Sequence, residues 1–349
     1  MERSKPIRFM VVMPVYNVEE YLEQSIRSVL EQTYDRFRLI MVDDGSPDNS
    51  GRICDTFAAD DDRLTVIHQP NSGQLAARMA GLKKAHEFAF SQEDSYVLFL
   101  DSDDWLEPHA METIASHLSR KNCDCLIYGF RRVLNGKTVF NTASEEVEGS
   151  VPQREAYRKI CMDRVYNSLC RKAIRLAAIP TTDYSAYHHI RLGEDLLQTL
   201  DILKQVKTIA FISDHLYNYR VNENSMTESI NYENFDFAYT VERSLLAFLR
   251  EQDVHTEGTW MLQWEKLAEY VYADIMKLLF SNHSWQKKKE WLKKIRSSHY
   301  VRTELARHVP YHRLPKNRRL ILGLFLNRCY TVLRLYHIWA SRHYAKSEK

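Results

Sequence analysis

Four short apolar runs alternate with helical patterns at the start of the chain. The runs cover residues 7–13, 37–42, 64–68 and 96–100. Between them, apolar side chains recur at helical spacing, as at Leu22, Ile26 and Val29. A short continuous apolar run predicts a strand buried on both faces, and strands that alternate with helices predict a mainly parallel sheet. The predicted fold class is therefore α/β, with a doubly wound sheet.

Each predicted strand is followed by a polar loop. The four loops are Pro14-Val15-Tyr16-Asn17, Asp43-Asp44-Gly45-Ser46, Gln69-Pro70-Asn71-Ser72-Gly73 and Asp101-Ser102-Asp103-Asp104. The carboxyl ends of the strands of an open parallel sheet form the crevice in which such folds bind ligands. We therefore expect the four loops to converge on one binding site.

The last of these loops holds three carboxylates within four positions. Carboxylates this close repel one another unless a cation neutralises them, and such a set of oxygen ligands suits Mg²⁺ or Mn²⁺ with phosphate oxygens completing the shell. A helix cap is the alternative: Asp103 or Asp104 could begin the helix that contains Met111. A phosphohydrolase with Asp101 as nucleophile would also place an Asp-x-Asp pair after a buried strand.

Beyond the acidic loop the pattern changes. An alternating stretch over 124–133 meets Asn135-Gly136, which predicts a hairpin that pairs with residues 138–140. Apolar residues then recur at helical spacing in the region after residue 235. We predict three parts: a sheet domain over 1–225, a helical subdomain over 226–309 and a tail over 310–349.

The tail is basic, whereas the rest of the chain is acidic. Residues 285–349 carry 17 Lys and Arg against 3 Asp and Glu, and residues 1–284 carry 31 against 43. One helix face is predicted to carry Ile321, Leu324, Phe325, Val332, Leu335, Tyr336 and Trp339, with Arg328 inside the stripe. A basic amphipathic helix of this kind suits an anionic membrane surface. A helix packed on the body of the protein, or against a partner, is the alternative.

Other sequence features indicate the compartment. No signal peptide is recognised, and no apolar stretch reaches the roughly 20 residues that span a bilayer. The six cysteines have neither disulfide nor zinc-site spacing. We expect a cytoplasmic protein, held peripherally on the inner face of the plasma membrane by its tail, with no nucleic-acid partner.

Taken together, the motifs resemble those of the family 2 glycosyltransferases. The four loops, Ala77-Arg78 and Gly193-Glu194-Asp195 occur in the family's order and spacing, and the similarity extends over about residues 7–227. The resemblance implies a bacterial, non-processive, inverting enzyme with a GT-A fold, whose catalytic domain is the part over 1–225. It would move a sugar from a nucleotide-diphosphate sugar, UDP-linked, to a hydroxyl of a glycan or lipid-linked acceptor in cell-surface polysaccharide synthesis. A non-catalytic nucleotide-binding protein on the same fold is a further alternative.

The resemblance also implies roles for single residues. Asp103 would hold the metal, Mn²⁺ or Mg²⁺, and either Asp43 or Asp44 would bind the base of the nucleotide. The nucleotide-sugar site would comprise Pro14, Tyr16, Asn17, Asp43, Asp44, Gly73, Arg78, Asp101, Ser102 and Arg220. Arg78 and Arg220 would contact phosphate, whereas a solvated surface arginine and an edge-strand ion pair are the respective alternatives. A tight turn with a helix cap is the alternative for Asp43 and Asp44.

The resemblance places the catalytic base at Glu194 or Asp195, and it favours Asp195 because the family usually uses the second acid. The alternative is an Asp-x-x-Gln capping box formed by Asp195 with Gln198. The chain departs from the family at two positions. Met79 stands where many members have asparagine, and Ser168 stands where relatives often have lysine.

Overall fold

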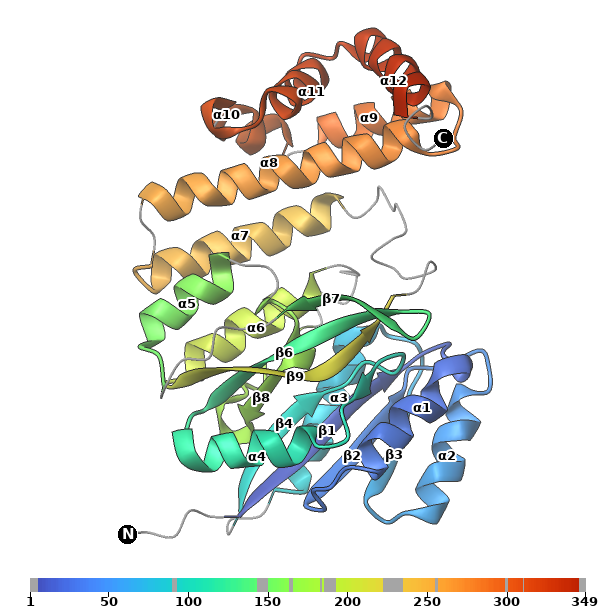
Figure 1. The fold of residues 1–349 in the computed structure, drawn as a ribbon, viewed down its shortest axis with the longest axis vertical. Helices are drawn as coiled ribbons and strands as arrows, with labels where there is room; N and C mark the ends of the chain where they lie inside the picture. The colour runs from blue at the N-terminus through green and yellow to red at the C-terminus, as the bar shows by residue number, and fades with distance from the viewer. Residues whose placement is uncertain are drawn as a thin grey trace. The chain divides into compact units, whose positions relative to one another are not determined.

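The computed structural model describes residues 6–89, 93–142, 150–162, 166–182, 184, 193–221, 235–254, 257–298, 301–309 and 311–344. The chain divides into two compact units, Met1–Glu223 and Asn224–Lys349 (Figure 1). This division lies two residues from the predicted boundary at 225. Asn224-Ser225-Met226-Thr227, which resemble a family segment that faces phosphate, and Pro310, with which the predicted tail begins, are outside the described residues.

The first unit begins with the predicted parallel sheet. Its strands are β1 (Ile7–Val15), β2 (Phe37–Asp43), β3 (Leu64–His68) and β4 (Asp94–Phe99), in the spatial order β3-β2-β1-β4. The connecting helices are α1 (Glu19–Leu30), α2 (Ser50–Asp60) and α3 (Gln74–Glu87). Each strand pair in this half is parallel. The α/β prediction is confirmed.

The sheet continues beyond β4 in mixed orientation. The added strands are β8 (Lys172–Arg175), β6 (Cys125–Leu134), β9 (Ile209–Arg220) and β5 (Trp105–Leu106), and β7 (Lys137–Thr142) pairs with β6. Strand β9 is parallel to β6, whereas β8 is antiparallel to both of its neighbours. The predicted hairpin is confirmed, because Asn135 and Gly136 join β6 to β7 with φ angles of 49° and 74°. The unit also contains α4 (Ala110–Lys121), α5 (Gln153–Met162) and α6 (Glu194–Gln205).

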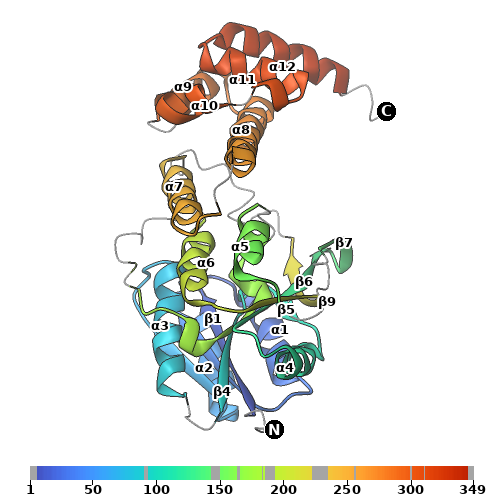
Figure 2. The same ribbon diagram turned by 90° about the vertical axis from the view of Figure 1, so that its left-hand side faces the viewer.

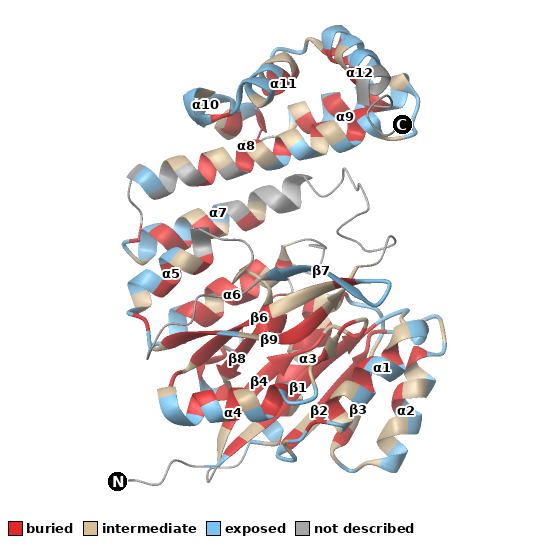
Figure 3. Ribbon diagram, viewed as in Figure 1, coloured by how far each residue is buried: buried red, intermediate tan, exposed pale blue. Residues whose placement is uncertain are grey.

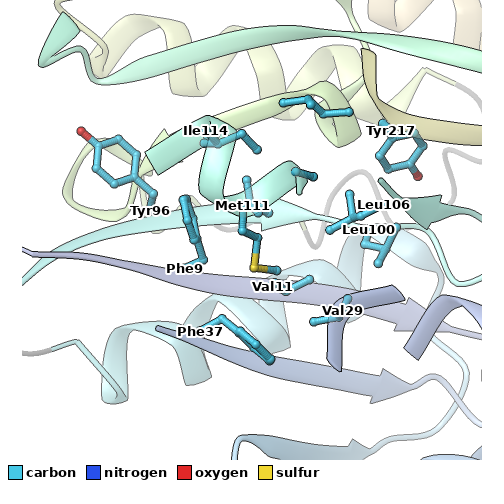
Figure 4. Packing of buried hydrophobic residues seen from close by; sticks show 14 of the residues in the cluster. Phe9, Val11, Val29, Phe37, Tyr96, Leu100, Leu106, Met111, Ile114 and Tyr217 are labelled. Carbon is cyan, nitrogen blue, oxygen red and sulfur yellow. The ribbon is translucent and has the colours of Figure 1, made fainter. Parts of the chain in front are cut away.

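Helices cover both faces of the parallel strands (Figure 2). Phe9, Val11 and Met13 of β1 point into a core shared with α1 and α4, where Met111 and Ile114 meet them (Figure 4). Val12, which lies between Val11 and Met13, faces α3 on the other side of the sheet. Figure 3 shows the resulting pattern, with buried strands between helices that are buried on one side only. This packing holds the carboxyl ends of β1, β2 and β4 in fixed positions.

Gly81 allows α3 to lie close to the sheet. A Cβ atom at this position would lie 2.5 Å from Cγ1 of Val12 and 3.4 Å from Cγ2 of Val42. Gly81→Ala should therefore lower the free energy of unfolding by about 1–2 kcal/mol, because the steric cost exceeds the gain in helix propensity. Gly323→Ala in a helix of the second unit is the control, since nothing lies within 4 Å of its added Cβ. Denaturant titration measures both, and a Gly81→Ala variant as stable as the parent would contradict this packing.

The second unit is helical. It contains α7 (Phe235–Glu251), α8 (Glu257–Phe280), α9 (Trp285–Ser297), α10 (Ala306–His308), α11 (Lys316–Leu326) and α12 (Tyr330–Tyr344). Side chains from α8, α9, α11 and α12 share one core, which includes Trp264, Leu292, Phe325 and Leu333. None of the helices among the described residues is both long and apolar enough to cross a bilayer.

The predicted single apolar face of the tail is wrong. Helices α11 and α12 are separate, and Arg328 between them has a φ angle of 61°. This turn changes the direction of the chain, so Ile321 and Phe325 pack into the core while Leu335 and Trp339 are exposed. Arg328 lies in the turn rather than within an apolar stripe.

Candidate active site

The strand-end loops meet at one edge of the sheet. Val15 at the end of β1 is in register with Asp43 at the end of β2, and Val12 is in register with Phe99 of β4. The loops also bond to each other: the Asn17 amide donates to the Ser46 hydroxyl at 3.3 Å. The predicted convergence is therefore present among these loops.

Asp44 holds the loop that follows β3. Its carboxylate is buried and accepts hydrogen bonds from the Gln69 side chain at 2.7 Å and from the backbone amides of Ser72 and Gly73 at 2.9 and 2.7 Å. Gly73 has a φ angle of 90°, a conformation that favours glycine. Asp44 therefore fixes the entry to α3, and its contact with the nucleotide base stays a prediction.

Asp43 stabilises its own turn. Its carboxylate accepts a bond from the Ser46 amide at 3.0 Å and contacts the His68 ring at 2.9 Å. Burial raises the pKa of Asp43, but these hydrogen bonds outweigh it and hold the pKa below its usual value. The turn predicted as the alternative is present, whereas the helix cap is not, because α2 begins after Asn49.

The other predicted residues of these loops differ in exposure. Pro14 is buried within β1, and Ser102 is buried in the acidic loop. Tyr16 is 47% exposed, and Asn17 has a φ angle of 54° that turns the chain after β1. Tyr16 and Asn17 are therefore the members of this group that solvent can reach.

The three aspartates of the acidic loop have different surroundings. Asp104 is buried and accepts hydrogen bonds from the Tyr217 hydroxyl at 2.6 Å and the Arg220 amide at 2.7 Å. Asp101 accepts hydrogen bonds from Gln74 at 2.9 Å and from Arg78 at 3.0 Å. The capping alternative is wrong, since the first helix after the loop is α4, whose N-cap is His109. Asp104 instead joins the loop to β9.

Asp103 differs from Asp101 and Asp104 because, among the residues that the structure describes, no other residue donates a hydrogen bond to its carboxylate. Burial, followed by the charge of Asp101, raises the pKa of Asp103 to about 6. Within the described residues, no three Asp, Glu, His or Cys side chains form a ready-made metal cluster. A cation at Asp103 would therefore need ligands from elsewhere, such as phosphate oxygens or water.

Arg78 joins the acidic loop to the start of α6. Its side chain is 2% exposed, and its guanidinium forms ion pairs with Asp101 at 3.0 Å, with Asp195, and with Glu194 at 3.9 Å. The surface-arginine alternative is wrong. Contact with phosphate stays a prediction, because the ion pairs that Arg78 forms here are with carboxylates.

Helix α6 presents Glu194 and Asp195 from its first turn. Its N-cap is Gly193, with a φ angle of 89° and no side-chain cap. The capping-box alternative is therefore wrong, and the Gln198 amide instead donates to the Met79 sulfur at 3.7 Å. Met79, which stands where many family members have asparagine, therefore lies against α6. Asp195 also accepts a 3.4 Å bond from the Leu169 amide, in the segment that follows the departure at Ser168.

Glu194 and Asp195 differ in access to solvent. The side chain of Glu194 is 11% exposed and that of Asp195 is 24% exposed. Burial, followed by the charge of Asp195, raises the pKa of Glu194 to about 7. Of the two acids, Asp195 is the more accessible one.

Arg220 lies beside the acidic loop. Its guanidinium is stacked between the rings of Tyr21 and Trp105, at 4.7 and 4.8 Å from their centres, and its Nε donates to the Asp103 carbonyl at 2.8 Å. The edge-strand alternative is wrong, because β9 lies between β6 and β5.

The sequence did not predict the contacts that Gln74 and Tyr217 make with the acidic loop, since no local pattern links either residue to that loop.

Arg78→Met should strongly destabilise the first unit. It would leave Asp101, Glu194 and Asp195 close together without their shared cation, and removal of one partner from a buried ion pair costs about 3–5 kcal/mol. The loss in the free energy of unfolding should be smaller at pH 5.5 than at pH 7.5. At the lower pH Glu194, whose pKa is raised to about 7, is protonated and no longer repels the two aspartates. Denaturant titration at both pH values measures it.

Arg27→Met is the control for this prediction. Arg27 pairs with Glu23 on the surface, with side chains 53% and 62% exposed, and its loss should cost no more than about 1 kcal/mol. Equal effects of the two substitutions would contradict the bridging role of Arg78.

The protein is an α/β protein in which one buried arginine joins the acidic loop after a strand of the sheet to a second acidic pair at the start of α6. Comparison with known proteins gives the family. The model described as "Glycosyl transferase family 2" matches residues 10–180. An uncharacterized glycosyltransferase of Haemophilus influenzae is 32% identical over 203 residues, which cover 56% of this chain and 72% of the relative. The chain belongs to glycosyltransferase family 2.

Further similarities extend over nearly the whole chain. The uncharacterized glycosyltransferase EpsJ of Bacillus subtilis is 27% identical over 344 residues, covering 93% of this chain and 94% of the relative. Proteins named for teichoic and teichuronic acid biosynthesis in B. subtilis are also similar to parts of it. The crystal structure of S. aureus TarS 1-349 with UDP-GlcNAc has a TM-score of 0.65 at 19% identity and covers 96% of this chain and 92% of that one. The fold is thus of the TarS type, GT-A, and family membership argues against a phosphohydrolase.

Proposed function

We propose that this glycosyltransferase is an inverting enzyme that takes its sugar from a nucleoside-diphosphate sugar, UDP-linked. The acceptor would be a hydroxyl of a glycan or lipid-linked intermediate of a cell-surface polysaccharide. Relatives named for teichoic and teichuronic acid synthesis support this acceptor class, and UDP-GlcNAc in the TarS complex supports the donor class. One observation carries the proposal. Arg78 contacts Asp101 of the acidic loop and Asp195 of α6, which supports a leaving-group site at the loop and a base at the start of the helix.

The donor end would be built around Asp103. Its carboxylate has a pKa raised by burial and no ion pair among the described residues, so it fits a hard divalent cation, Mn²⁺ or Mg²⁺. When bound, such a cation acts as a Lewis acid that neutralises the departing diphosphate. Arg220, next to Asp103, adds a positive charge for the same group. Asp101, held by Gln74 and Arg78, would orient the sugar.

The acceptor end would use Asp195 as the general base. The acceptor hydroxyl attacks the anomeric carbon from the side opposite the diphosphate, and a carboxylate on that side takes the hydroxyl proton. Asp195 is more exposed than Glu194, and its ion pair with the Arg78 guanidinium holds it beside the acidic loop. Glu194, whose side chain is 11% exposed, is less accessible to an acceptor hydroxyl.

The site of action is part of the proposal. We infer that the enzyme works in the cytoplasm, peripherally on the inner face of the plasma membrane. The charge distribution supports this location, because residues 285–349 carry 17 Lys and Arg against 3 Asp and Glu. A lipid-linked acceptor would be presented at the same surface.

A panel of nucleotide sugars tests the proposed donor class. Thermal unfolding is measured with each nucleotide sugar in the presence of Mn²⁺, together with the slow release of nucleoside diphosphate. We expect UDP-linked sugars to stabilise the protein and to be cleaved, and both effects to require the metal. Stabilisation by nucleoside monophosphates alone, without cleavage of any nucleotide sugar, would contradict the proposal.

A further inference from the structure

The outward face of α12 is an apolar stripe. Val332, Leu335 and Trp339 follow one another at helical spacing and are 47%, 60% and 55% exposed, and Ile338 beside them is 38% exposed. On the opposite side of the helix, Leu333 is buried in the core of the second unit. A helix that is apolar on both sides is not explained by packing within its own unit, and grouped apolar side chains on a surface indicate an interaction site.

The stripe lies in a strongly basic segment. Between Glu304 and Glu348 the chain has no acidic residue and nine Lys and Arg. Arg313 and Arg318 are neutralised by Glu265 and Glu269 of α8. Four more basic residues of α11, α12 and the turn between them are exposed: Lys316, Arg319, Arg328 and Arg334. The surface around the stripe is therefore complementary to an anionic partner.

We propose that α12 lies in the interface of an anionic lipid bilayer, with the Val332, Leu335, Ile338 and Trp339 side chains inserted between the headgroups. The exposed basic side chains would meet the lipid phosphates. An apolar stripe with a tryptophan, flanked by lysine and arginine and free of acids, is the pattern of interfacial helices. This inference rests on the membrane location proposed above and names the surface responsible for it.

A second copy of the chain fits this surface less well. Stable protein–protein interfaces use roughly 20–30 residues from each partner, whereas the stripe offers four side chains. Two copies joined through α12 would also bring two basic segments together, at a cost in charge repulsion. A lipid surface has neither problem, because it is extended and negatively charged.

Vesicle flotation with the full-length protein tests the proposal. Vesicles of phosphatidylglycerol and phosphatidylcholine are compared with vesicles of phosphatidylcholine alone, at low and high salt. We expect binding only to the anionic vesicles, reduced by salt, and at least tenfold weaker for the double variant Leu335→Ser with Trp339→Ser. The control is Phe140→Ser in β7, which removes a 51% exposed aromatic side chain from the first unit and should not change binding.

Quenching of tryptophan fluorescence by brominated lipids is a second test, which does not depend on a variant that could fail to fold. Trp339→Phe preserves an apolar side chain, so it should still bind vesicles but lose most of the tryptophan quenching. Failure of the parent protein to float, or equal flotation of the double variant, would overturn the proposal. A parent protein that is dimeric in solution and a double variant that is monomeric would instead assign the stripe to contact between copies, and would also overturn it. Cleavage of a soluble nucleotide sugar should be the same in all these variants, so failure here is separable from failure of the proposed sugar transfer.

Discussion

Asp195→Asn should lower turnover by roughly 10²–10⁴-fold while the affinity for the nucleotide sugar stays nearly unchanged. The amide has the size of the carboxylate but cannot take the proton of the acceptor hydroxyl. Binding of the donor should persist, because the proposed donor contacts lie in the acidic loop and at Arg220. Single-turnover kinetics and calorimetric titration of the donor on the same variant measure the two quantities.

Two further variants separate catalysis from structure. Asp201→Asn makes the same change on the same helix, where the carboxylate accepts a 2.9 Å bond from the Tyr184 hydroxyl, and it should leave turnover near that of the parent. Glu194→Gln should also remain active if Asp195 is the base. An active Asp195→Asn enzyme together with an inactive Glu194→Gln enzyme would move the base to residue 194.

Excess chelator should abolish turnover, and Asp103→Asn should remove the stabilisation by Mn²⁺ and nucleotide together. Metal ligands must be deprotonated, and the pKa of Asp103 in the metal-free protein is about 6, raised by burial and then by the charge of Asp101. Protons therefore compete with the metal below this value. From pH 7.5 to pH 5 the apparent affinity for Mn²⁺ should fall by about tenfold. Thermal unfolding with a series of Mn²⁺ concentrations at each pH measures it.

Asp104→Asn is the matched control for the metal prediction. Asp104 is the next residue, yet its carboxylate accepts bonds from Tyr217 and Arg220 within the protein. This variant should unfold at a lower temperature but keep its response to Mn²⁺. Full activity of the parent enzyme in excess chelator would show that the reaction does not require a metal.

The sequence predicted those strands whose buried side chains are apolar. Strands β1 to β4 each contain a short apolar run, so their positions and the loops after them could be recognised. Strand β8 was not predicted because Lys172 is buried in it while carrying a charged group, and its pKa is lowered to about 8 by burial. The break between α11 and α12 was missed because its left-handed residue is Arg328, where sequence rules expect glycine or asparagine.

The site could be predicted as a set of residues but not as a set of contacts. The motifs identified Asp101, Asp195 and Arg78, yet Arg78 is 23 residues from Asp101 and 117 from Asp195 in the chain. Only the packing of α3 and α6 brings them together. The same limit applies to Tyr217, whose bond to Asp104 joins residues 113 positions apart. Sequence patterns report local periodicity and composition, whereas such long-range pairs follow from the tertiary structure.

Hydrolysis of the donor in ¹⁸O-labelled water tests the central claim most directly. In the slow reaction without acceptor, water takes the place of the acceptor hydroxyl and attacks the anomeric carbon. We expect the released nucleoside diphosphate to carry no ¹⁸O, because the bond between the anomeric carbon and the diphosphate oxygen breaks. Label in a phosphate group, or release of sugar phosphate with nucleoside monophosphate, would mean attack at phosphorus and would contradict sugar transfer at this site.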